Sequence, residues 1–327
     1  MSRMVDGEWR TDVEQIVTAD GEFDRDETTF RDWIRNDPNA QFEPAAGRYH
    51  LYISRACPWA HRVAIVRRVT GLEATISMDV VDPVREDQGW EFAPEKPGCT
   101  EDSIRGADYL REIYAAADPN YSGRVTVPVL WDRERETIVN NESSELMRML
   151  DTAFEEFASR DVTLYPEERR DEIDQVVSNI YEPINNGVYR AGFAETQSAY
   201  ERAVTELFDA LDRWESVLEE QRYLLGDRMT LADVAMFTTL YRFDPVYYVH
   251  FKCNERTIDS FPNLSGYLRD LYQVPGVAET CDLDHVKEHY YRSHTDINPK
   301  GRVPTGPKRD LTTEHDRDRL PGSPPVS

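Results

Sequence analysis

A cysteine followed by a proline is the first candidate for chemistry. Cys57 and Pro58 stand between a short β-rich segment and a helical pattern. A thiol at such a junction faces the unpaired N–H groups of the helix N-terminus, which stabilise the thiolate over the thiol. Because the thiolate is the nucleophile of thiol exchange, Cys57 is the predicted catalytic residue. The alternative is a buried, inert cysteine.

The residue three positions after Cys57 decides how the thiol is recycled. Ala60 stands where many redox sites carry a second cysteine. We therefore expect Cys57 to form a mixed disulfide that an external thiol releases. The other cysteines, Cys99, Cys253 and Cys281, form no C-x-x-C motif, and this spacing predicts no disulfide framework. We expect Cys253 to be structural.

Two further segments have residue types suited to binding a small thiol. At Val127-Pro128, a cis proline would turn the Val127 backbone toward the cysteine for strand-like pairing with an extended thiol peptide. A trans proline at a sheet edge is the alternative. Glu142-Ser143 opens a predicted helix, whose N–H groups and hydroxyl suit a carboxylate while Glu142 suits an α-amino group. An ordinary N-cap is the competing interpretation.

Three histidines near the C-terminal end form a weaker constellation. His285 and His289 have the i, i+4 spacing that can ligate a metal on a helix, and His294 follows. No further ligand accompanies them, so we expect no metal site. The sequence also lacks a glycine-rich phosphate loop and a G-x-S-x-G nucleophile motif.

The elements that must position these residues alternate in the first half of the chain. Apolar and β-branched runs predict strands at 49–53, 76–81, 125–131 and 137–139, and helical patterns cover 58–69, 103–116 and 142–154. Residues 82–102 form a predicted loop around Trp90. The order β-α-β-α-β-β-α is that of a thioredoxin-like α/β domain.

The second half is predicted to be all helical. Apolar stripes cover 173–184 and 203–218, and 231–240 is apolar nearly all round, which indicates a buried helix capped by Thr230 and Asp233. We predict an irregular N-terminal extension at 1–45, a thioredoxin-like thiol-binding domain at 46–157, a helical substrate domain at 158–297 and a partly disordered tail at 298–327.

Composition narrows the class of protein. The 38 basic and 62 acidic residues give a net charge of −24, which argues against nucleic acid and anionic membrane surfaces as partners. Only five of the basic residues are lysines, and the acidic residues are dispersed. We interpret this as adaptation to a high-salt cytoplasm, with an ordinary acidic protein as the alternative. No apolar run of transmembrane length and no secretory signal is evident, so we expect a soluble cytoplasmic protein.

Four strings carry a resemblance to a known family. The thioredoxin-like half followed by a helical half resembles the glutathione transferase superfamily. Within that superfamily, four strings of this sequence resemble those of the glutathionyl-hydroquinone reductases, the xi class. The strings are Arg55-Ala56-Cys57-Pro58-Trp59-Ala60-His61-Arg62, Asn140-Asn141-Glu142-Ser143-Ser144-Glu145, Asn185-Asn186-Gly187-Val188-Tyr189-Arg190-Ala191-Gly192-Phe193-Ala194 and His250-Phe251-Lys252-Cys253-Asn254. The resemblance spans roughly residues 30–305.

This resemblance implies an activity and a set of site residues. Cys57 would attack the sulfur of a glutathionyl-hydroquinone, expel the hydroquinone and be released by a second thiol. The residues implied in glutathione binding are Trp90, Arg124, Val127, Glu142 and Ser143. Those implied around the hydroquinone are Tyr189, Tyr247 and Tyr290, although Tyr248 and Tyr291 are adjacent to two of them and are alternatives.

The sequence leaves other functions open. A broader thiol transferase resembling the omega class, acting on disulfides or dehydroascorbate, is one alternative, and a non-catalytic interaction module of the same fold is another. The family implies a homodimer. It also implies glutathione as the thiol co-substrate, whereas the inferred salt adaptation favours γ-glutamylcysteine; no metal cofactor is expected.

Overall fold

Packing divides the chain into two units. The computed structural model describes residues 2–12, 20–23 and 28–326. Unit 1 comprises Met1–Gln15, Asp26–Asp161 and Thr280–Val303, and unit 2 comprises Ile16–Arg25, Val162–Glu279 and Pro304–Ser327. Unit 1 combines a sheet with helices, and the described part of unit 2 is helical. Each unit combines segments that are far apart in the sequence. The units therefore do not test the predicted domain boundaries at residues 45, 157 and 297, which stay a prediction.

A four-stranded mixed sheet forms the centre of unit 1. Its order is β4-β3-β5-β6, from strands β3 (Tyr49–Ile53), β4 (Ser77–Val80), β5 (Val129–Asp132) and β6 (Thr137–Asn140). Strand β3 runs parallel to β4 and antiparallel to β5. Every residue of β3 and β5 is buried, as expected for strands in the middle of a covered sheet.

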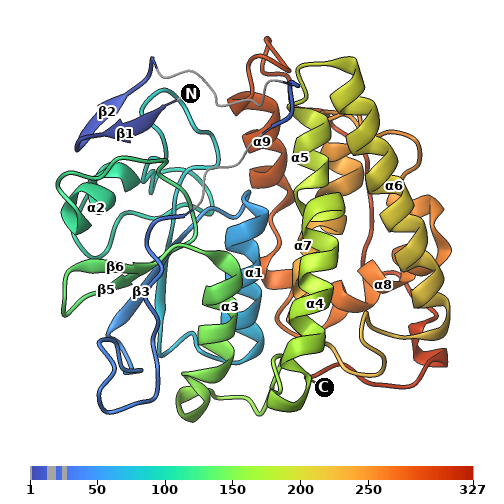
Figure 1. Ribbon diagram of the computed structural model, residues 1–327, viewed down its shortest axis with the longest axis horizontal. Coiled ribbons are helices and arrows are strands. Elements are labelled where there is room, and N and C mark those ends of the chain that lie inside the picture. Colours follow the sequence, from blue (N-terminus) through green and yellow to red (C-terminus); the bar gives the residue numbers. More distant parts are fainter. Residues whose placement is uncertain (1, 13–19, 24–27, 327) are drawn as a thin grey trace. The chain divides into compact units, whose positions relative to one another are not determined.

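Four α-helices of unit 1 lie within the residues that the structure describes. They are α1 (Pro58–Val69), α2 (Leu110–Ala117), α3 (Ser143–Thr152) and α9 (Leu283–Ser293). Helices α1 and α3 pack against each other beside the sheet (Figure 1). The order β3-α1-β4-α2-β5-β6-α3 confirms the predicted thioredoxin-like arrangement. Helix α9 comes from the part of the sequence predicted to be helical substrate domain, yet it packs within unit 1.

Two expectations for unit 1 are wrong in detail. The helix predicted at 103–116 begins only at Leu110. The Asp102 carboxylate accepts the N–H groups of Ile104 and Ala107, and Gly106 has φ +68°, so the chain forms a turn there instead of a helix. The N-terminal extension, expected to be irregular, contains an antiparallel pair of strands, β1 (Arg3–Val5) and β2 (Glu8–Arg10).

Unit 2 consists of helices around a buried central helix. The helices are α4 (Arg170–Ile180), α5 (Gly187–Gly192), α6 (Gln197–Glu220), α7 (Leu231–Arg242) and α8 (Pro262–Gln273). Every residue of α7 is buried, as predicted, and its N-terminus has the expected capping box. The Asp233 carboxylate of this box also accepts the Tyr267 hydroxyl at 2.8 Å. These bonds satisfy a polar group inside the helical core.

Parts of the C-terminal tail contact the helices of unit 2, and the expected partial disorder of this segment stays a prediction. Arg317 is fully buried and donates to the carbonyl oxygens of Gln221 and Arg222. The Gln273 side chain donates to the Leu311 carbonyl at 2.9 Å. The tail is rich in proline and charged residues, so its composition does not predict these contacts. They are hydrogen bonds that involve backbone carbonyls and not contacts between apolar side chains.

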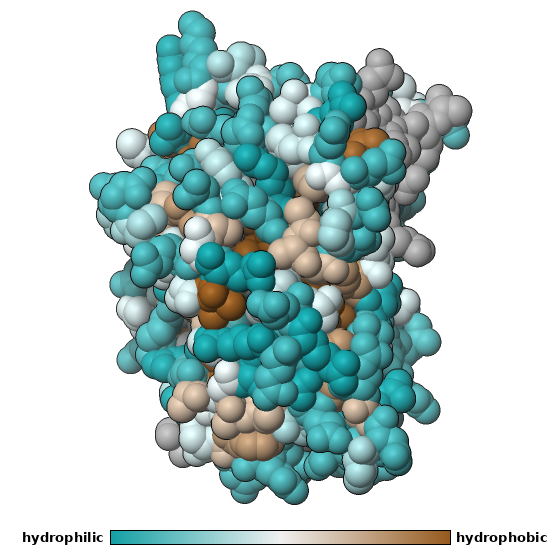
Figure 2. Space-filling model, turned by 90° about the vertical axis from the view of Figure 1, so that its left-hand side faces the viewer, coloured by the Kyte–Doolittle hydropathy of each residue, from teal (hydrophilic) through white to brown (hydrophobic). Residues whose placement is uncertain are grey.

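The surface agrees with the composition. The face shown in Figure 2 is mostly hydrophilic, with small separate apolar patches. Within the described residues, no helix is long and apolar enough to cross a membrane.

Candidate active site

Cys57 occupies the position immediately before helix α1, as the sequence predicts. Pro58 is the first helical residue, and the first turn of α1 contains no acidic side chain although the chain has 62 acidic residues. The thiol side chain makes no capping hydrogen bond to α1. The positive end of the helix therefore acts on the sulfur without an opposing carboxylate in that turn, an arrangement that favours a thiolate.

The backbone before strand β5 lies beside this sulfur. The Val127–Pro128 peptide bond is cis, as one of the two sequence interpretations requires. The Cys57 sulfur lies 3.6 Å from the carbonyl oxygen of Val127. Two segments separated by 70 residues in the sequence are thus adjacent in the structure. An extended peptide bound along Val127 would carry its own thiol close to Cys57.

Helix α3 begins as expected with Glu142 at its N-cap position and Ser143 as its first residue. The Glu142 carboxylate accepts the Ser144 N–H at 3.2 Å, and the Asn140 side-chain oxygen accepts the Glu142 N–H at 2.7 Å. Glu142 is therefore an N-cap, one of the two interpretations of this segment. Capping uses one carboxylate oxygen, Oε1; the other, Oε2, is 3.4 Å from the Thr28 hydroxyl.

Trp90 lies in the loop between β4 and α2 and is buried to 5% exposure. Its indole stacks on the His289 ring, with 5.2 Å between centroids and 19° between planes. The indole Nε1 is buried and has no hydrogen-bond partner among the described residues. A buried N–H donor without an acceptor destabilises the fold unless a ligand accepts its hydrogen bond. The geometry therefore suits Trp90 to substrate binding.

Arg124 lies three residues before Val127 and is partly exposed. The Tyr121 hydroxyl donates to the Arg124 carbonyl at 2.8 Å, and the Tyr121 ring stacks on Phe30 with 5.6 Å between centroids. The N-terminal extension thus supports the backbone that carries Arg124. Its guanidinium belongs to the same unit as Cys57 and Glu142.

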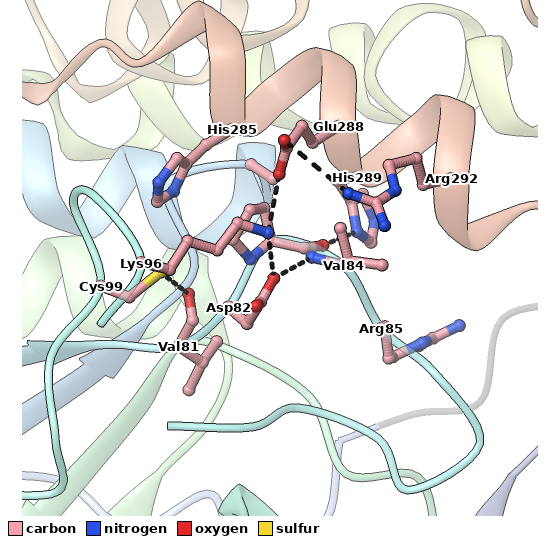
Figure 3. Close-up of polar contacts among 12 residues, drawn as sticks. Val81, Asp82, Val84, Arg85, Lys96, Cys99, His285, Glu288, His289 and Arg292 are labelled. Carbon is pink, nitrogen blue, oxygen red and sulfur yellow. Dashed lines mark hydrogen bonds and ion pairs between the residues drawn. The ribbon is translucent and has the colours of Figure 1, made fainter. Parts of the chain in front are cut away.

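Helix α9 fixes the Trp90 loop, a role that the sequence analysis missed. His285 and His289 bind the carbonyl oxygens of Pro97 and Pro83, each at 2.7 Å. Lys96 lies between two carboxylates, 2.8 Å from Asp82 and 2.7 Å from Glu288 (Figure 3). The only indication in the sequence was the spacing of His285, Glu288, His289 and Arg292, which places them on one helix face.

The candidate tyrosines fall into both units. Tyr290 belongs to unit 1 with Cys57; it is buried and contacts the rings of His289 and His294. Its neighbour Tyr291, the alternative, has its pKa raised to about 12 by burial. Tyr189 and Tyr247 belong to unit 2.

In unit 2, Tyr189 and Tyr247 share one aromatic cluster. Their ring centroids are 5.9 Å apart, and Phe251 contacts both rings, at 5.5 Å from Tyr189 and 5.6 Å from Tyr247. Phe193 packs on the same cluster. Tyr248, the alternative to Tyr247, is half-exposed. The segments 185–194 and 250–254 therefore contribute to one buried aromatic cluster.

Two π-helical turns place these tyrosines. Tyr181–Asn185 precedes Tyr189, and Phe243–Tyr247 ends on Tyr247. Each turn contains a proline, which cannot donate the usual helical hydrogen bond and widens the turn. The Tyr248 N–H accordingly donates to the Phe243 carbonyl at 2.8 Å, five residues back. Pro183 and Pro245 are the sequence features by which these turns could have been found.

Burial makes two of the remaining cysteines, Cys99 and Cys253, less suited to thiolate chemistry. All four cysteines lie in the described part of the chain and are thiols. Burial raises the pKa of Cys99 to about 12 and raises that of Cys253 further. Cys281 lies 3.8 Å from the His61 ring. No group of three His, Cys, Asp or Glu side chains within the described ranges is arranged to hold a metal ion.

Models of two protein domains match the chain. The glutathione S-transferase N-terminal domain matches residues 56–153, and the glutathione S-transferase C-terminal domain matches residues 197–270. The first match contains Cys57, Val127 and the start of α3.

Relatives match nearly the whole chain. The glutathionyl-hydroquinone reductase YqjG of Escherichia coli is 46% identical over 97% of this chain and 99% of its own length. The glutathionyl-hydroquinone reductase PcpF of Sphingobium chlorophenolicum is 47% identical over 95% of this chain and 98% of its own. The glutathione-bound structure of YqjG superimposes with a TM-score of 0.89 at 45% identity, covering 97% of this chain and 99% of that one. A xi-class structure from Natrialba magadii gives a TM-score of 0.94 at 57% identity, covering 99% of this chain and 98% of that one. The chain belongs to the xi class of the glutathione S-transferase family, together with the glutathionyl-hydroquinone reductases.

Proposed function

We propose that this chain is a glutathionyl-hydroquinone reductase that works through Cys57. The observation that carries the proposal is the place of Cys57 at the positive end of α1, 3.6 Å from the Val127 carbonyl, with Ala60 in place of a resolving cysteine. A single activated thiol suits a reaction in which an external thiol completes the cycle. The names of the relatives YqjG and PcpF point to the same reaction.

The reaction has two balanced steps. The Cys57 thiolate attacks the sulfur of the thioether, the carbon–sulfur bond breaks, and the aryl carbon takes a proton, which yields a free hydroquinone and a mixed disulfide on Cys57. A second thiolate then attacks this disulfide, forms an oxidised thiol dimer and releases the Cys57 thiolate. The conjugate is reduced and two small thiols are oxidised.

Unit 1 supplies the proposed thiol-binding residues. The Val127 backbone pairs with the cysteine part of the thiol, and the start of α3 holds the γ-glutamyl head, with its carboxylate on the helix N-terminus and Ser143 and its amino group near Glu142. Trp90 and Arg124 are proposed to contact the glycine end of glutathione. Glutathione in the YqjG structure supports this class of co-substrate.

Tyr189, Tyr247 and Tyr290 are proposed to surround the hydroquinone. A phenol hydroxyl can donate to a hydroquinone oxygen and assist proton transfer as the carbon–sulfur bond breaks. The shared cluster of Tyr189 and Tyr247 supports a joint role for these two residues.

The direct test compares two cysteine variants. Cys57→Ser should lose reductive release of hydroquinone, because a serine hydroxyl is un-ionised at neutral pH and cannot form the mixed disulfide. Cys253→Ser, the matched control, should keep most of the activity because Cys253 is buried and its pKa is raised. Retention of more than about a tenth of the rate in Cys57→Ser would disprove the mechanism.

The donor thiol is proposed to be γ-glutamylcysteine as well as glutathione. The two thiols share the γ-glutamyl head and the cysteine and differ at the glycine carboxylate, where Arg124 and Trp90 are proposed to bind. One charged contact is worth about 1.5–3 kcal/mol, roughly tenfold or more in affinity, so the site should discriminate. In molar-range salt, γ-glutamylcysteine should support turnover at least as well as glutathione. A tenfold advantage for glutathione in the same salt would refute this preference and leave the Cys57 chemistry intact.

The assembly is proposed to be a two-fold homodimer in a reducing, high-salt cytoplasm. The family relation supports the dimer, and a charge of −24 with few lysines supports the salt adaptation. Light scattering in high salt should give about twice the 37.9 kDa of one chain. A species of one chain's mass would contradict the dimer.

A further inference from the structure

Arg309 of the C-terminal tail forms a buried ion pair inside unit 2. Its Nη1 atom lies 3.3 Å from Oδ2 of Asp244, and only 9% of the Arg309 side chain and 4% of the Asp244 side chain are exposed. Its Nε atom lies 3.7 Å from Oδ1 of Asp259, a carboxylate that is 46% exposed. All three residues belong to unit 2. The buried pair differs from a surface ion pair, because removal of one partner leaves an uncompensated charge in the interior.

Asp244 belongs to the π-helical turn that carries Tyr247. The turn comprises Phe243–Tyr247, and Asp244 is its second residue. The Asp244 carboxylate also accepts the N–H groups of Ile258 at 2.6 Å and of Asp259 at 3.3 Å. The side chain therefore connects the turn both to a later segment of unit 2 and to the C-terminal tail.

The charge of Arg309 favours an ionised Asp244. Burial raises the pKa of Asp244, whereas the charge of Arg309 and the two N–H donors act to lower it, and the like charge of Asp259 adds to the rise. Arg269 lies 3.8 Å from the Asp259 carboxylate, so this carboxylate has a second cation beside it. An ionised carboxylate accepts backbone N–H groups more strongly than a protonated one. Arg309 therefore strengthens the hydrogen bonds by which Asp244 holds the turn.

The position of the Tyr247 ring depends on this turn. Tyr247 is fully buried, and its ring centroid lies 5.9 Å from that of Tyr189. Its carbonyl oxygen accepts the Cys253 N–H at 3.0 Å. Because close-packed neighbours surround a buried ring, the ring follows its own backbone when that backbone moves. A displacement of the turn at Asp244 therefore displaces the phenol hydroxyl of Tyr247.

We propose that Arg309 is a positioning residue for hydroquinone release, which fixes the Tyr247 phenol through Asp244. The inference rests on the proposed role of Tyr247 beside the hydroquinone. A phenol assists proton transfer only when its hydroxyl lies within hydrogen-bond distance of the substrate oxygen, and small displacements slow such a step strongly. The C-terminal tail thereby supports the proposed hydroquinone site of the helical unit.

Hydrogen exchange tests the positioning without any substrate. The backbone amides of the peptide 243–253 are followed by mass spectrometry in the full-length protein at high salt. Arg309→Gln leaves the buried Asp244 carboxylate without its cation, so this peptide should exchange about tenfold faster. Arg309→Lys keeps a cation and should stay near the wild type. Unchanged exchange in Arg309→Gln, or an equal rise in Arg309→Lys, would overturn the proposal.

Two reactions separate positioning from a general loss of stability. Arg309→Gln should slow hydroquinone release about tenfold, because the Tyr247 hydroxyl is displaced. Exchange with a small disulfide, which needs the Cys57 thiol alone, should keep its rate. Equal losses in the two reactions would show that Arg309 only stabilises the fold, and this result would also overturn the proposal.

Gln273→Ala is the matched control. The Gln273 side chain donates to the carbonyl oxygens of Leu311 and Thr313, each at 2.9 Å, so it binds the same part of the tail by a different contact. This variant should leave the exchange of 243–253 and both rates unchanged. Losses equal to those of Arg309→Gln would assign the effect to docking of the tail and overturn the proposal. If the wild type releases no hydroquinone, the proposed function fails, and hydrogen exchange still decides whether Arg309 fixes the turn.

Discussion

The indole of Trp90 lies nearly parallel to the imidazole of His289, with 5.2 Å between the ring centroids. This contact joins the loop between β4 and α2 to a helix about 200 residues later in the chain. His289 also binds the Pro83 carbonyl at 2.7 Å, so one side chain holds both the backbone and the ring of the loop. The orientation of Trp90 therefore depends on helix α9.

Replacing His289 should weaken thiol binding. His289→Leu removes a hydrogen bond and an aromatic stack, each worth about 1 kcal/mol, which corresponds to roughly tenfold or more in affinity. Quenching of tryptophan fluorescence by glutathione measures the dissociation constant. His285→Leu is the control, because His285 binds the Pro97 carbonyl but does not stack on Trp90. Equal losses in the two variants would argue against a specific role for the stack.

The tyrosines separate two kinds of thiol chemistry. Tyr189→Phe and Tyr247→Phe remove hydroxyls from the aromatic cluster of unit 2 without changing ring packing. Each should slow hydroquinone release at least about tenfold, because proton transfer contributes strongly to such steps. Exchange with a small disulfide should be spared, since it needs Cys57 alone. Tyr248→Phe should change neither rate; if it slows hydroquinone release more than Tyr247→Phe, the assignment shifts by one residue.

The pH dependence of stability should report His250. Burial, aided by the charge of Lys252, lowers the pKa of His250 to about 4. In the unfolded chain the pKa is about 6.5, so between these values the unfolded state binds a proton that the folded state does not. Stability is then lost as the pH falls from about 6.5 toward 4.

The measurement for His250 is denaturant unfolding at pH 7 and pH 4.5 in the same high salt. His250→Gln should lose about 2 kcal/mol less between the two pH values than the wild type. The carboxylates titrate in both proteins and cancel in the comparison. Parallel losses would show that His250 is protonated in the folded state at pH 4.5.

Local sequence patterns were enough to predict the elements around Cys57. The position of the Cys57 thiol was predictable because a strand, a proline and a helical pattern follow one another in the sequence. The cap of α7 was predictable from the spacing of Thr230 and Asp233. Contacts between distant segments were not predictable in the same way. The binding of the Pro83 carbonyl by His289 and the burial of Arg317 against backbone carbonyls depend on packing that no local pattern encodes. The turn at 102–106 was missed because the side chain of Asp102 competes with the helix for its N–H groups.

The central claim is that Cys57 accepts the glutathionyl group from the conjugate. The most direct measurement is a mass spectrum of the protein after mixing with a glutathionyl-hydroquinone in the absence of free thiol. The account predicts one glutathione disulfide on Cys57 and about one free hydroquinone released per chain, because no second thiol is present to complete the cycle. Release of hydroquinone with Cys57 left unmodified, or an aryl group attached to Cys57, would contradict it.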